Sequence, residues 1–294
     1  MAPHAMFVHA HPDDESSKGA ATMAKLADQG YRVSVVTLTD GSAGEILNPK
    51  MDRPGVAERM PEVRRQELAR ALDVIGVTDH FWLGYRDSGF VEDFDGDGSV
   101  LAGDAFYNMD RDRVVRDLVE IVRSTRPEVI VTYPEDGGYP HPDHLRCHDV
   151  SVEAYHAAGD AARYPDAGEP HEPLKLYYTN VLSRRRVETL HAACEERGIE
   201  SPLQRFLDRL DPDEPDPNTT HVEVGAWIER RSQALLAHAT QVDPDGMWFR
   251  IPEDLIREVY PYEDFQLAHA RVTTAIPEHS LFEGILPDTA ASSA

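Results

Sequence analysis

The sequence predicts an α/β protein with a doubly wound, mostly parallel sheet of the Rossmann-like kind and a smaller C-terminal lobe. Short apolar runs alternate with helical patterns through the first 180 residues. The run at 31–39, YRVSVVTLT, is rich in β-branched residues, as in strands that helices cover on both faces. The length of 294 residues suits one large domain with an appended lobe.

The elements can be placed in order along the chain. Glycines end two of the helical patterns, at Gly30 and Gly76. We expect strands at 5–10, 31–39, 80–84, 127–134 and 175–182, and helices at 16–29, 57–75, 111–124 and 142–158. After residue 183 the pattern loosens, with helices expected near 183–197 and 223–240. Residues 1–182 are therefore interpreted as a Rossmann-like domain, and 183–294 as a C-terminal lobe packed on it as a single structural unit.

Two polar clusters follow strands of this predicted sheet. HAHPDDE (9–15) ends the first strand, and GGYPHPDH (137–144) follows the fourth. In the strand order 3-2-1-4-5, the carboxyl ends of strands 1 and 4 flank the point where the order reverses, and ligands bind there. The topology therefore brings two distant clusters together at one binding site.

The residue types in these clusters indicate a metal. Catalytic zinc takes three N or O ligands and leaves one position for water, while a nearby carboxylate serves as general base. The spacing alone leaves open which aspartate binds the metal and which accepts a proton. The alternative is that each cluster caps the following helix, which accounts for one aspartate per helix but not for the histidines. The candidates are His11, Asp13, Asp14, His141, Asp143 and His144.

Charge and composition limit the partners. The formal net charge of -24 argues against binding to nucleic acid or to anionic membranes. No apolar run approaches the ~18 residues of a membrane span, and the first residues lack the features of a signal peptide. Two cysteines, Cys147 and Cys194, form no disulfide framework, so we expect a cytoplasmic protein. The sequence does not indicate an oligomeric state.

The motifs resemble those of a known family. HAHPDDES, TLTDGSAGE, LGYRDSG, TYPEDGGYPHPDH and HATQ are similar to motifs of the LmbE-like/PIG-L zinc-dependent deacetylases. Longer blocks, such as RCHDVSVEAYHAAGD, resemble the branch of mycothiol S-conjugate amidases. The resemblance runs from about residue 5 to about residue 285. It implies the LmbE-like fold and a Zn²⁺ cofactor, although Fe²⁺ suits the same ligands.

The resemblance also implies roles for the clustered residues. The zinc ligands would be His11, Asp14 and His144. Asp13 would be the general base, and His141 the general acid or the electrostatic partner of the leaving amine. Tyr139 would donate to the tetrahedral oxyanion. Asp143 would orient His141.

Four further residues are substrate-binding candidates. The resemblance places Glu45, Arg64 and Asp87 around a sugar-inositol group, where charge-assisted hydrogen bonds suit many hydroxyls. The simpler alternatives are an Arg64–Glu67 pair on a solvated helix and a turn role for Asp87. Lys18 stands where the deacetylase branch has a small polar residue. It would favour a larger, amino-acid-bearing substrate, or it is an ordinary exposed helix residue.

The implied activity is amide hydrolysis. A mycothiol S-conjugate, a small molecule, would be cleaved to a mercapturate and glucosaminyl-inositol, in detoxification. The alternatives are the N-acetylglucosaminyl-inositol deacetylase of mycothiol biosynthesis and a pathway-specific amidase or deacetylase in natural-product biosynthesis. A non-catalytic sugar-binding protein on the same fold is less consistent with an intact set of Asp13, Tyr139 and His141.

One acidic loop suggests a second cation. Residues 93–104, DFDGDGSVLAGD, carry aspartates at positions 1, 3 and 5 and glycine at position 6 of the EF-hand loop pattern. Position 12 is Asp104 where glutamate is usual, and the flanks do not form a clear helix pair. Ca²⁺ is therefore a minor hypothesis here, and a solvated acidic loop is the alternative.

Overall fold

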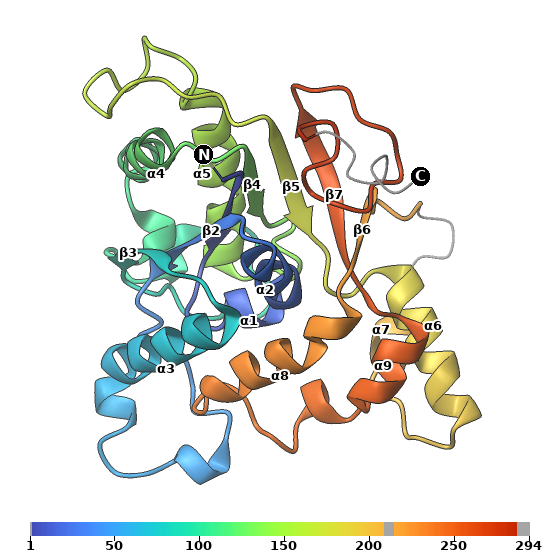
Figure 1. The fold of residues 1–294 in the computed structure, drawn as a ribbon. Helices are drawn as coiled ribbons and strands as arrows, with labels where there is room; N and C mark the ends of the chain where they lie inside the picture. Colours follow the sequence, from blue (N-terminus) through green and yellow to red (C-terminus); the bar gives the residue numbers. More distant parts are fainter. Residues whose placement is uncertain (1, 209–214, 287–294) are drawn as a thin grey trace, which may run out of the picture.

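A seven-stranded sheet forms the centre of the molecule (Figure 1). The computed structural model describes residues 2–208 and 215–286. The strand order is β3-β2-β1-β4-β5-β7-β6. The first five strands are parallel, and β7 is antiparallel to both β5 and β6. The strands are β1 (His4–His9), β2 (Arg32–Thr39), β3 (Asp79–Tyr85), β4 (Val129–Thr132), β5 (Lys175–Thr179), β6 (Thr220–Glu223) and β7 (Tyr262–Ala270).

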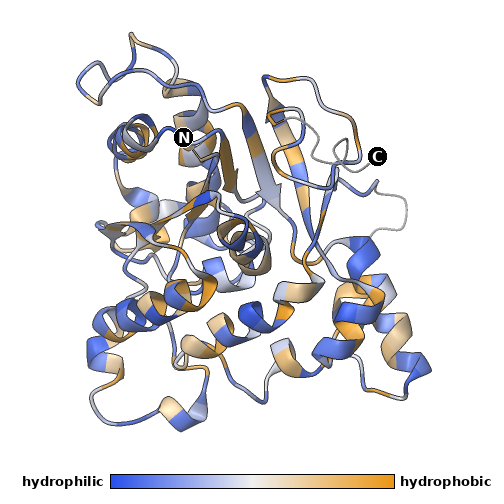
Figure 2. Ribbon diagram, viewed as in Figure 1, coloured by the Kyte–Doolittle hydropathy of each residue, from blue (hydrophilic) through white to orange (hydrophobic). Residues whose placement is uncertain are grey.

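The central strand β1 shows why the sheet is covered on both faces. All six of its residues are buried. Its side chains alternate, as in any strand. Ala5 and Phe7 belong to the core cluster on one face, and Met6 and Val8 to the cluster on the other. Figure 2 shows apolar residues concentrated along the central strands, while the outer helices carry both polar and apolar residues.

Helices cover the two faces of the sheet. The helices α2, α3 and α8 pack their apolar residues on the face of Ala5 and Phe7, and α4 and α5 on the opposite face. The long helices are amphipathic, so each buries one side and leaves the other to solvent. Their bounds are α2 (Ala20–Asp28), α3 (Met60–Ile75), α4 (Arg111–Thr125), α5 (Pro142–Ala157) and α8 (Ile228–Ala237).

The predicted helix at 16–29 is wrong in one respect, because the structure divides it into α1 (Asp14–Ser17) and α2. Gly19 separates the two helices with φ of 102°. A Cβ atom at Gly19 would lie 3.1 Å from Cε1 of Phe7 on β1. The helix therefore breaks at a position where a side chain would press against the strand and where the backbone conformation favours glycine.

The C-terminal part contributes to the same sheet. Strands β6 and β7, which the sequence pattern did not predict, extend it beyond β5. A third core cluster lies between α6 (Arg184–Glu196), α7 (Gln204–Leu207) and α9 (Glu253–Val259). The predicted strand order 3-2-1-4-5 is confirmed. The division at residue 182 stays a prediction, and the sheet continues across it.

Candidate metal centre

The turn after β1 places one set of polar residues at the carboxyl end of the sheet. Here the backbone of Asp13 has φ of 127°, a conformation that non-glycine residues rarely adopt. Such strain persists where surrounding structure enforces it, and it is common at functional sites. The Asp14 carboxylate accepts a hydrogen bond from the backbone N–H of His11 (2.8 Å), which closes the turn.

The loop after β4 supplies the second set. His141 is the N-cap of α5, and its Nδ1 accepts the backbone N–H of Asp143 (3.1 Å). Because Nδ1 is an acceptor, the neutral ring carries its proton on Nε2. Burial, then His11 and His144, lowers the pKa of His141 to about 2.

The three predicted metal ligands lie together in the structure. Ligand atoms of His11, Asp14 and His144 lie within 4.8 Å of one another, and all three residues are buried. Asp14 Oδ2 lies 3.3 Å from His11 Nδ1 and 3.4 Å from His144 Nε2. A carboxylate oxygen between two imidazole nitrogens is a donor set that suits zinc or ferrous iron.

The hydrogen bonding of His144 is that expected of a metal ligand. Its Nδ1 lies 2.9 Å from the carbonyl oxygen of Gly137, so Nδ1 carries the proton. The lone pair is then on Nε2, which is buried without a hydrogen-bond partner in the described residues. A histidine that donates from one nitrogen to a carbonyl and directs the other inward is typical of metal ligands. The residues present therefore fit a metal ion.

Asp143 contacts a different histidine from the one expected. Its Oδ2 lies 3.1 Å from Nε2 of His11 and also accepts the backbone N–H of Ser88 (2.9 Å). The expectation that its carboxylate orients His141 is wrong, because only the backbone N–H of Asp143 contacts that ring. Asp143 instead fixes the orientation of His11.

Asp87 adds a second candidate cluster. Ligand atoms of His11, Asp87 and His141 also lie within 4.8 Å of one another. Asp87 accepts the backbone N–H of Gly89, so it closes a turn as well as facing the site. Although burial opposes its ionisation, His11 and Arg64 hold the pKa of Asp87 well below its usual value.

Arg64 reaches the site from α3, and the solvated-helix alternative is excluded. The residue is 3% exposed. Its guanidinium donates to the carbonyl oxygens of Gly41 (2.9 Å) and Pro12 (2.7 Å) and to Asp13 Oδ2 (3.1 Å). Glu67 accepts from Thr240 instead of pairing with Arg64. Arg64 therefore holds the strained turn and the Asp13 carboxylate in place.

A buried pair behind this turn was missed by sequence reasoning. Glu15 Oε1 lies 2.7 Å from Nε2 of His238, and Glu15 Oε2 accepts the backbone N–H of Asp13 (3.0 Å). Burial opposes ionisation of Glu15, but His238 and Ser16 lower its pKa to about 2. The HATQ motif, which contains His238, was the available signal.

The remaining predicted residues line the open part of the site. A cleft of about 500 Å³ is lined by Glu45, Arg64, Asp87, Tyr139 and His141, among others. Glu45 stands exposed at its edge. The Tyr139 ring lies 4.5 Å from the His144 ring, and its side chain is 44% exposed. Phe90, which was not predicted, lies beside both Tyr139 and His141.

Lys18 lies deeper than an ordinary surface residue. Its Nζ lies 2.5 Å from Asp14 Oδ1 and 3.2 Å from Ser17 Oγ. The same ammonium lies 5.5 Å from the centre of the Tyr133 ring and 6.0 Å from that of Tyr139. Lys18 and Tyr139 also line a second hollow of about 320 Å³ with Tyr178 and Leu182.

The acidic loop at 93–104 contributes no ligand cluster. In residues 2–208 and 215–286, both groups of three converging ligand atoms contain His11. Asp104, at position 12 of the pattern, pairs with Arg86 (2.6 Å). Asp95 and Asp97 accept backbone N–H groups within the loop. Calcium binding here stays a prediction.

Comparison with known proteins agrees with this geometry. The family model PIG-L, described as GlcNAc-PI de-N-acetylase, matches residues 6–155. The chain belongs to the PIG-L family. The matched segment contains both turns that supply the metal centre. A mycothiol S-conjugate amidase of Streptomyces coelicolor is 46% identical over 286 residues, covering 95% of this chain and 96% of that protein.

Other members of the PIG-L family are also similar along the whole chain. A 1D-myo-inositol 2-acetamido-2-deoxy-alpha-D-glucopyranoside deacetylase of Streptomyces avermitilis is 37% identical, with 96% of this chain and 97% of that protein covered. The N,N'-diacetylchitobiose deacetylase from Pyrococcus horikoshii has the same fold, with a TM-score of 0.62 and 19% identity. It covers 99% of this chain and 89% of that structure. These relatives are named for hydrolysis of amide bonds.

Proposed function

We propose that this protein is a metal-dependent amidase that hydrolyses mycothiol S-conjugates. Water would be added across the amide, giving a mercapturate and glucosaminyl-inositol. The observation that carries the proposal is the buried convergence of His11, Asp14 and His144 beside Asp13, in a chain 46% identical to a mycothiol S-conjugate amidase. The role that fits this reaction is detoxification in the cytoplasm.

Three residues would hold the metal. Asp14, His11 and His144 would bind it, and a bound Zn²⁺ or Fe²⁺ would supply Lewis-acid stabilisation of the carbonyl oxygen and acidify water. Asp143 keeps His11 in one orientation through the 3.1 Å contact to Nε2. The Gly137 carbonyl does the same for His144.

Asp13 is the proposed general base. Its carboxylate faces the cleft, and Arg64 holds one oxygen at 3.1 Å. The other oxygen has no hydrogen-bond partner among the described residues, so it would accept the proton of the attacking water. The carboxylate of Asp13, where the backbone is strained, faces the cleft, while that of its neighbour Asp14 faces His11 and His144.

Tyr139 and His141 are the proposed donors to the developing charge. Tyr139 stands in the cleft, and its hydroxyl makes no hydrogen bond to the described residues. His141 presents Nε2–H, since its Nδ1 already accepts from Asp143. Donors that are fixed before the reaction stabilise an oxyanion and a leaving nitrogen with little reorganisation.

The two hollows beside Tyr139 fit the two ends of an amide substrate. Glu45, Arg64 and Asp87 line the larger cleft, where we propose that the sugar-inositol end binds. Lys18 and Leu182 line the second hollow, which would take the acyl end. A substrate with an S-conjugated acyl group needs this second space, whereas an acetyl group does not.

A paired assay on one zinc-loaded preparation tests the proposal. One reaction contains a bimane-labelled mycothiol conjugate and the other N-acetylglucosaminyl-inositol. We expect strong cleavage of the conjugate with little deacetylation. Removal of the metal with a chelator should abolish activity, and Zn²⁺ or Fe²⁺ should restore it. A preference for the acetylated substrate would overturn the amidase assignment.

The Asp13→Asn variant tests the general base. We expect kcat to fall by about 10²–10⁴-fold, the range for loss of a general base, while bound metal stays at one equivalent. Metal content by mass spectrometry separates this effect from loss of the centre. Asp95→Asn, in the exposed acidic loop, is the matched control and should leave kcat unchanged. Near-normal kcat in Asp13→Asn would contradict the assigned role.

A further inference from the structure

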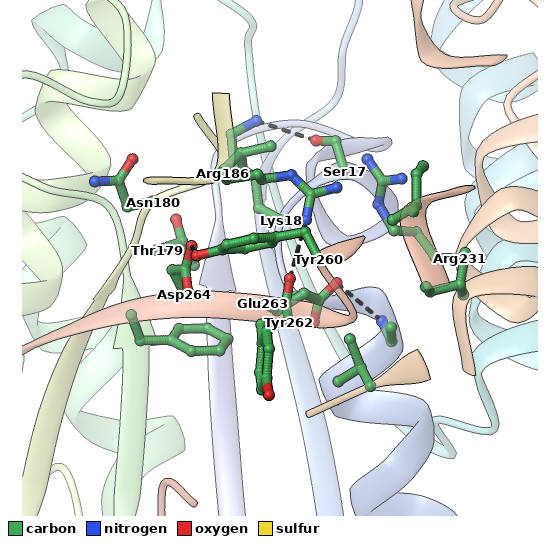
Figure 3. Close-up of a pocket in the computed structure, with 17 residues that line it drawn as sticks. Ser17, Lys18, Thr179, Asn180, Arg186, Arg231, Tyr260, Tyr262, Glu263 and Asp264 are labelled. Carbon is green, nitrogen blue, oxygen red and sulfur yellow. Dashed lines mark hydrogen bonds between the residues drawn. The ribbon is translucent and has the colours of Figure 1, made fainter. Parts of the chain in front are cut away.

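A third hollow lies beside the active site, between the sheet and the C-terminal helices (Figure 3). Its wall includes Lys18, Thr179, Asn180 and Val181, which also line the hollow next to Tyr139. The space open to the centre of a water-sized sphere is about 30 Å³, enough for a group of two or three atoms. Two arginines, from α6 and α8, face this space.

Within the described residues, these two arginines lack carboxylate partners. Arg186 donates from Nη1 to the carbonyl oxygen of Tyr262 (2.9 Å). Arg231 is 9% exposed and makes no hydrogen bond or ion pair to the described part of the chain. Burial, together with Arg186, lowers the pKa of Arg231 to about 10. A guanidinium that is nine-tenths buried and has no hydrogen-bond acceptor is costly, so this arrangement favours the binding of an anion.

The nearby carboxylates bind other donors. Glu263 accepts the backbone N–H groups of Ala21 (3.2 Å) and Thr22 (2.8 Å), at the start of α2. Asp264 accepts hydrogen bonds from three side chains. Among the described residues, neither Glu263 nor Asp264 forms an ion pair with Arg186 or Arg231 within 4.0 Å. The partners of Asp264 are Ser183, His221 and Tyr260.

Aromatic rings lie beside both guanidinium groups. Arg186 lies 5.7 Å from the centre of the Tyr260 ring, and Arg231 lies 5.3 Å from that of Trp248. A guanidinium whose charge faces a ring keeps N–H groups that can donate to a planar acceptor. The site is therefore arranged before any ligand arrives, which lowers the entropy cost of binding.

We propose that Arg186 and Arg231 bind a carboxylate group in this hollow. A carboxylate has three heavy atoms and matches the guanidinium fork with two parallel hydrogen bonds, so both its size and its chemistry fit. Two kinds of molecule carry such a carboxylate. One is a small free carboxylate such as acetate. The other is an acidic S-substituent of a bound conjugate, which would reach the arginines from the adjoining hollow.

Acetate binding to the zinc-loaded protein tests the site directly. Titration at constant ionic strength, with chloride as the balancing anion, should raise the melting temperature in a saturable manner. In Arg231→Met the dissociation constant should increase by at least about tenfold. Arg186→Gln should have the same effect, which keeps the test valid if one variant fails to fold. Arg250→Met, at an exposed arginine of the same region, is the control.

Acetate that binds the metal affects all variants equally, so the difference between variants reports on the arginines. Equal acetate effects in the wild type, Arg231→Met and Arg186→Gln would overturn the proposal. This titration measures binding without turnover, so its result remains valid even if the protein shows no amidase activity.

A second arm, which rests on the proposed function, identifies the source. We would compare kcat/KM for two conjugates that differ only in a carboxylate or its primary amide on the S-substituent. A preference for the carboxylate in the wild type that disappears in Arg231→Met assigns the site to the substrate. If the wild type has equal kcat/KM values for the two conjugates and still binds acetate, the site is assigned to a free carboxylate. Both results support the site.

Discussion

At the scale of single residues, the proposed metal centre depends on groups outside its set of ligands. Asp143 Oδ2 lies 3.1 Å from His11 Nε2, and the backbone of Ser88 holds the same oxygen. Burial raises the pKa of Asp143, which His11 and Ser88 counteract. The carboxylate would therefore act on a bound metal through His11, because it fixes which nitrogen of that ring faces Asp14.

We predict that Asp143→Asn weakens metal binding by about 10–100-fold, the usual effect of losing such a partner. The amide keeps the shape but loses the charge that orients His11. Competition with a chelator of known affinity measures the change. Asp149→Asn, at an exposed aspartate on the same helix, is the control. Unchanged affinity in Asp143→Asn would show that the packing of His11 alone sets its orientation.

At the scale of elements, the loop after β2 positions Arg64. Gly41 has φ of 64°, and a Cβ atom there would lie 2.7 Å from Cζ of Arg64. The Gly41 carbonyl also accepts a hydrogen bond from that guanidinium. The loop and α3 therefore approach so closely that only a glycine leaves room for the arginine that holds Asp13.

Gly41→Ala should reduce kcat/KM roughly 10–100-fold, since small displacements of catalytic groups have effects of this size. The matched control is Gly55→Ala. Gly55 has φ of 82°, but a Cβ atom there would meet no other atom within 4 Å, so it carries the backbone strain without the clash. Steady-state kinetics of both variants separate the two causes. Equal losses of kcat/KM would attribute the effect to strain alone.

A buried histidine at the start of β1 makes the free energy of unfolding depend on pH. His4 lies between Ser34 of β2 (2.8 Å) and the carbonyl oxygen of Thr125 (3.2 Å). Burial, then Arg32, lowers its pKa from 6.5 to about 4. The unfolded state therefore binds more protons between these values, so stability present above pH 6.5 is lost as the pH falls toward 4.

His4→Gln should make the free energy of unfolding less dependent on pH between 6.5 and 4. Urea denaturation at several pH values measures the slope. The same substitution at the exposed His279 is the control and should leave the slope as in the wild type. A slope that does not change in His4→Gln would mean that other groups dominate acid unfolding in this window.

Elements with a strong local pattern could be predicted from the sequence. The β-branched run at 32–39 and the two histidine-rich turns carry their signals within short segments, so the sequence predicted the parallel strands and the candidate ligands that the structure brings together. Strand β6 has only four residues, and β7 mixes polar and apolar positions. Their pairing depends on distant contacts that no local pattern encodes. The contact of Glu15 with His238, 223 residues away, is equally non-local.

At the scale of the whole molecule, Glu278 joins the C-terminal segment to the sheet. Its buried carboxylate pairs with Lys175 on β5 and accepts from Tyr177 (2.7 Å) and Thr220 (2.8 Å). Its backbone N–H donates to the carbonyl oxygen of Thr219. A single acid therefore links β5, β6 and the chain beyond β7.

Glu278→Gln should lower the free energy of unfolding by about 3–5 kcal/mol, because it leaves the Lys175 ammonium buried without a countercharge. Adding Lys175→Met to that variant should recover part of the loss. Chemical denaturation of both single variants and the double variant measures the coupling. Glu258→Gln, which removes an exposed pair with Arg197, should change stability by less than about 1 kcal/mol. An additive double variant would refute the coupling.

The buried contact of Glu15 with His238 limits how far this enzyme can be shortened. The family match ends at residue 155, which suggests a compact catalytic fragment for excision or for fusion to another protein. Such a fragment would lack α8 and would leave Glu15 without its histidine, directly beneath the turn that carries Asp13. The smallest transferable unit must therefore extend at least to His238. Grafting the two ligand turns onto another α/β scaffold would require a replacement for that histidine as well.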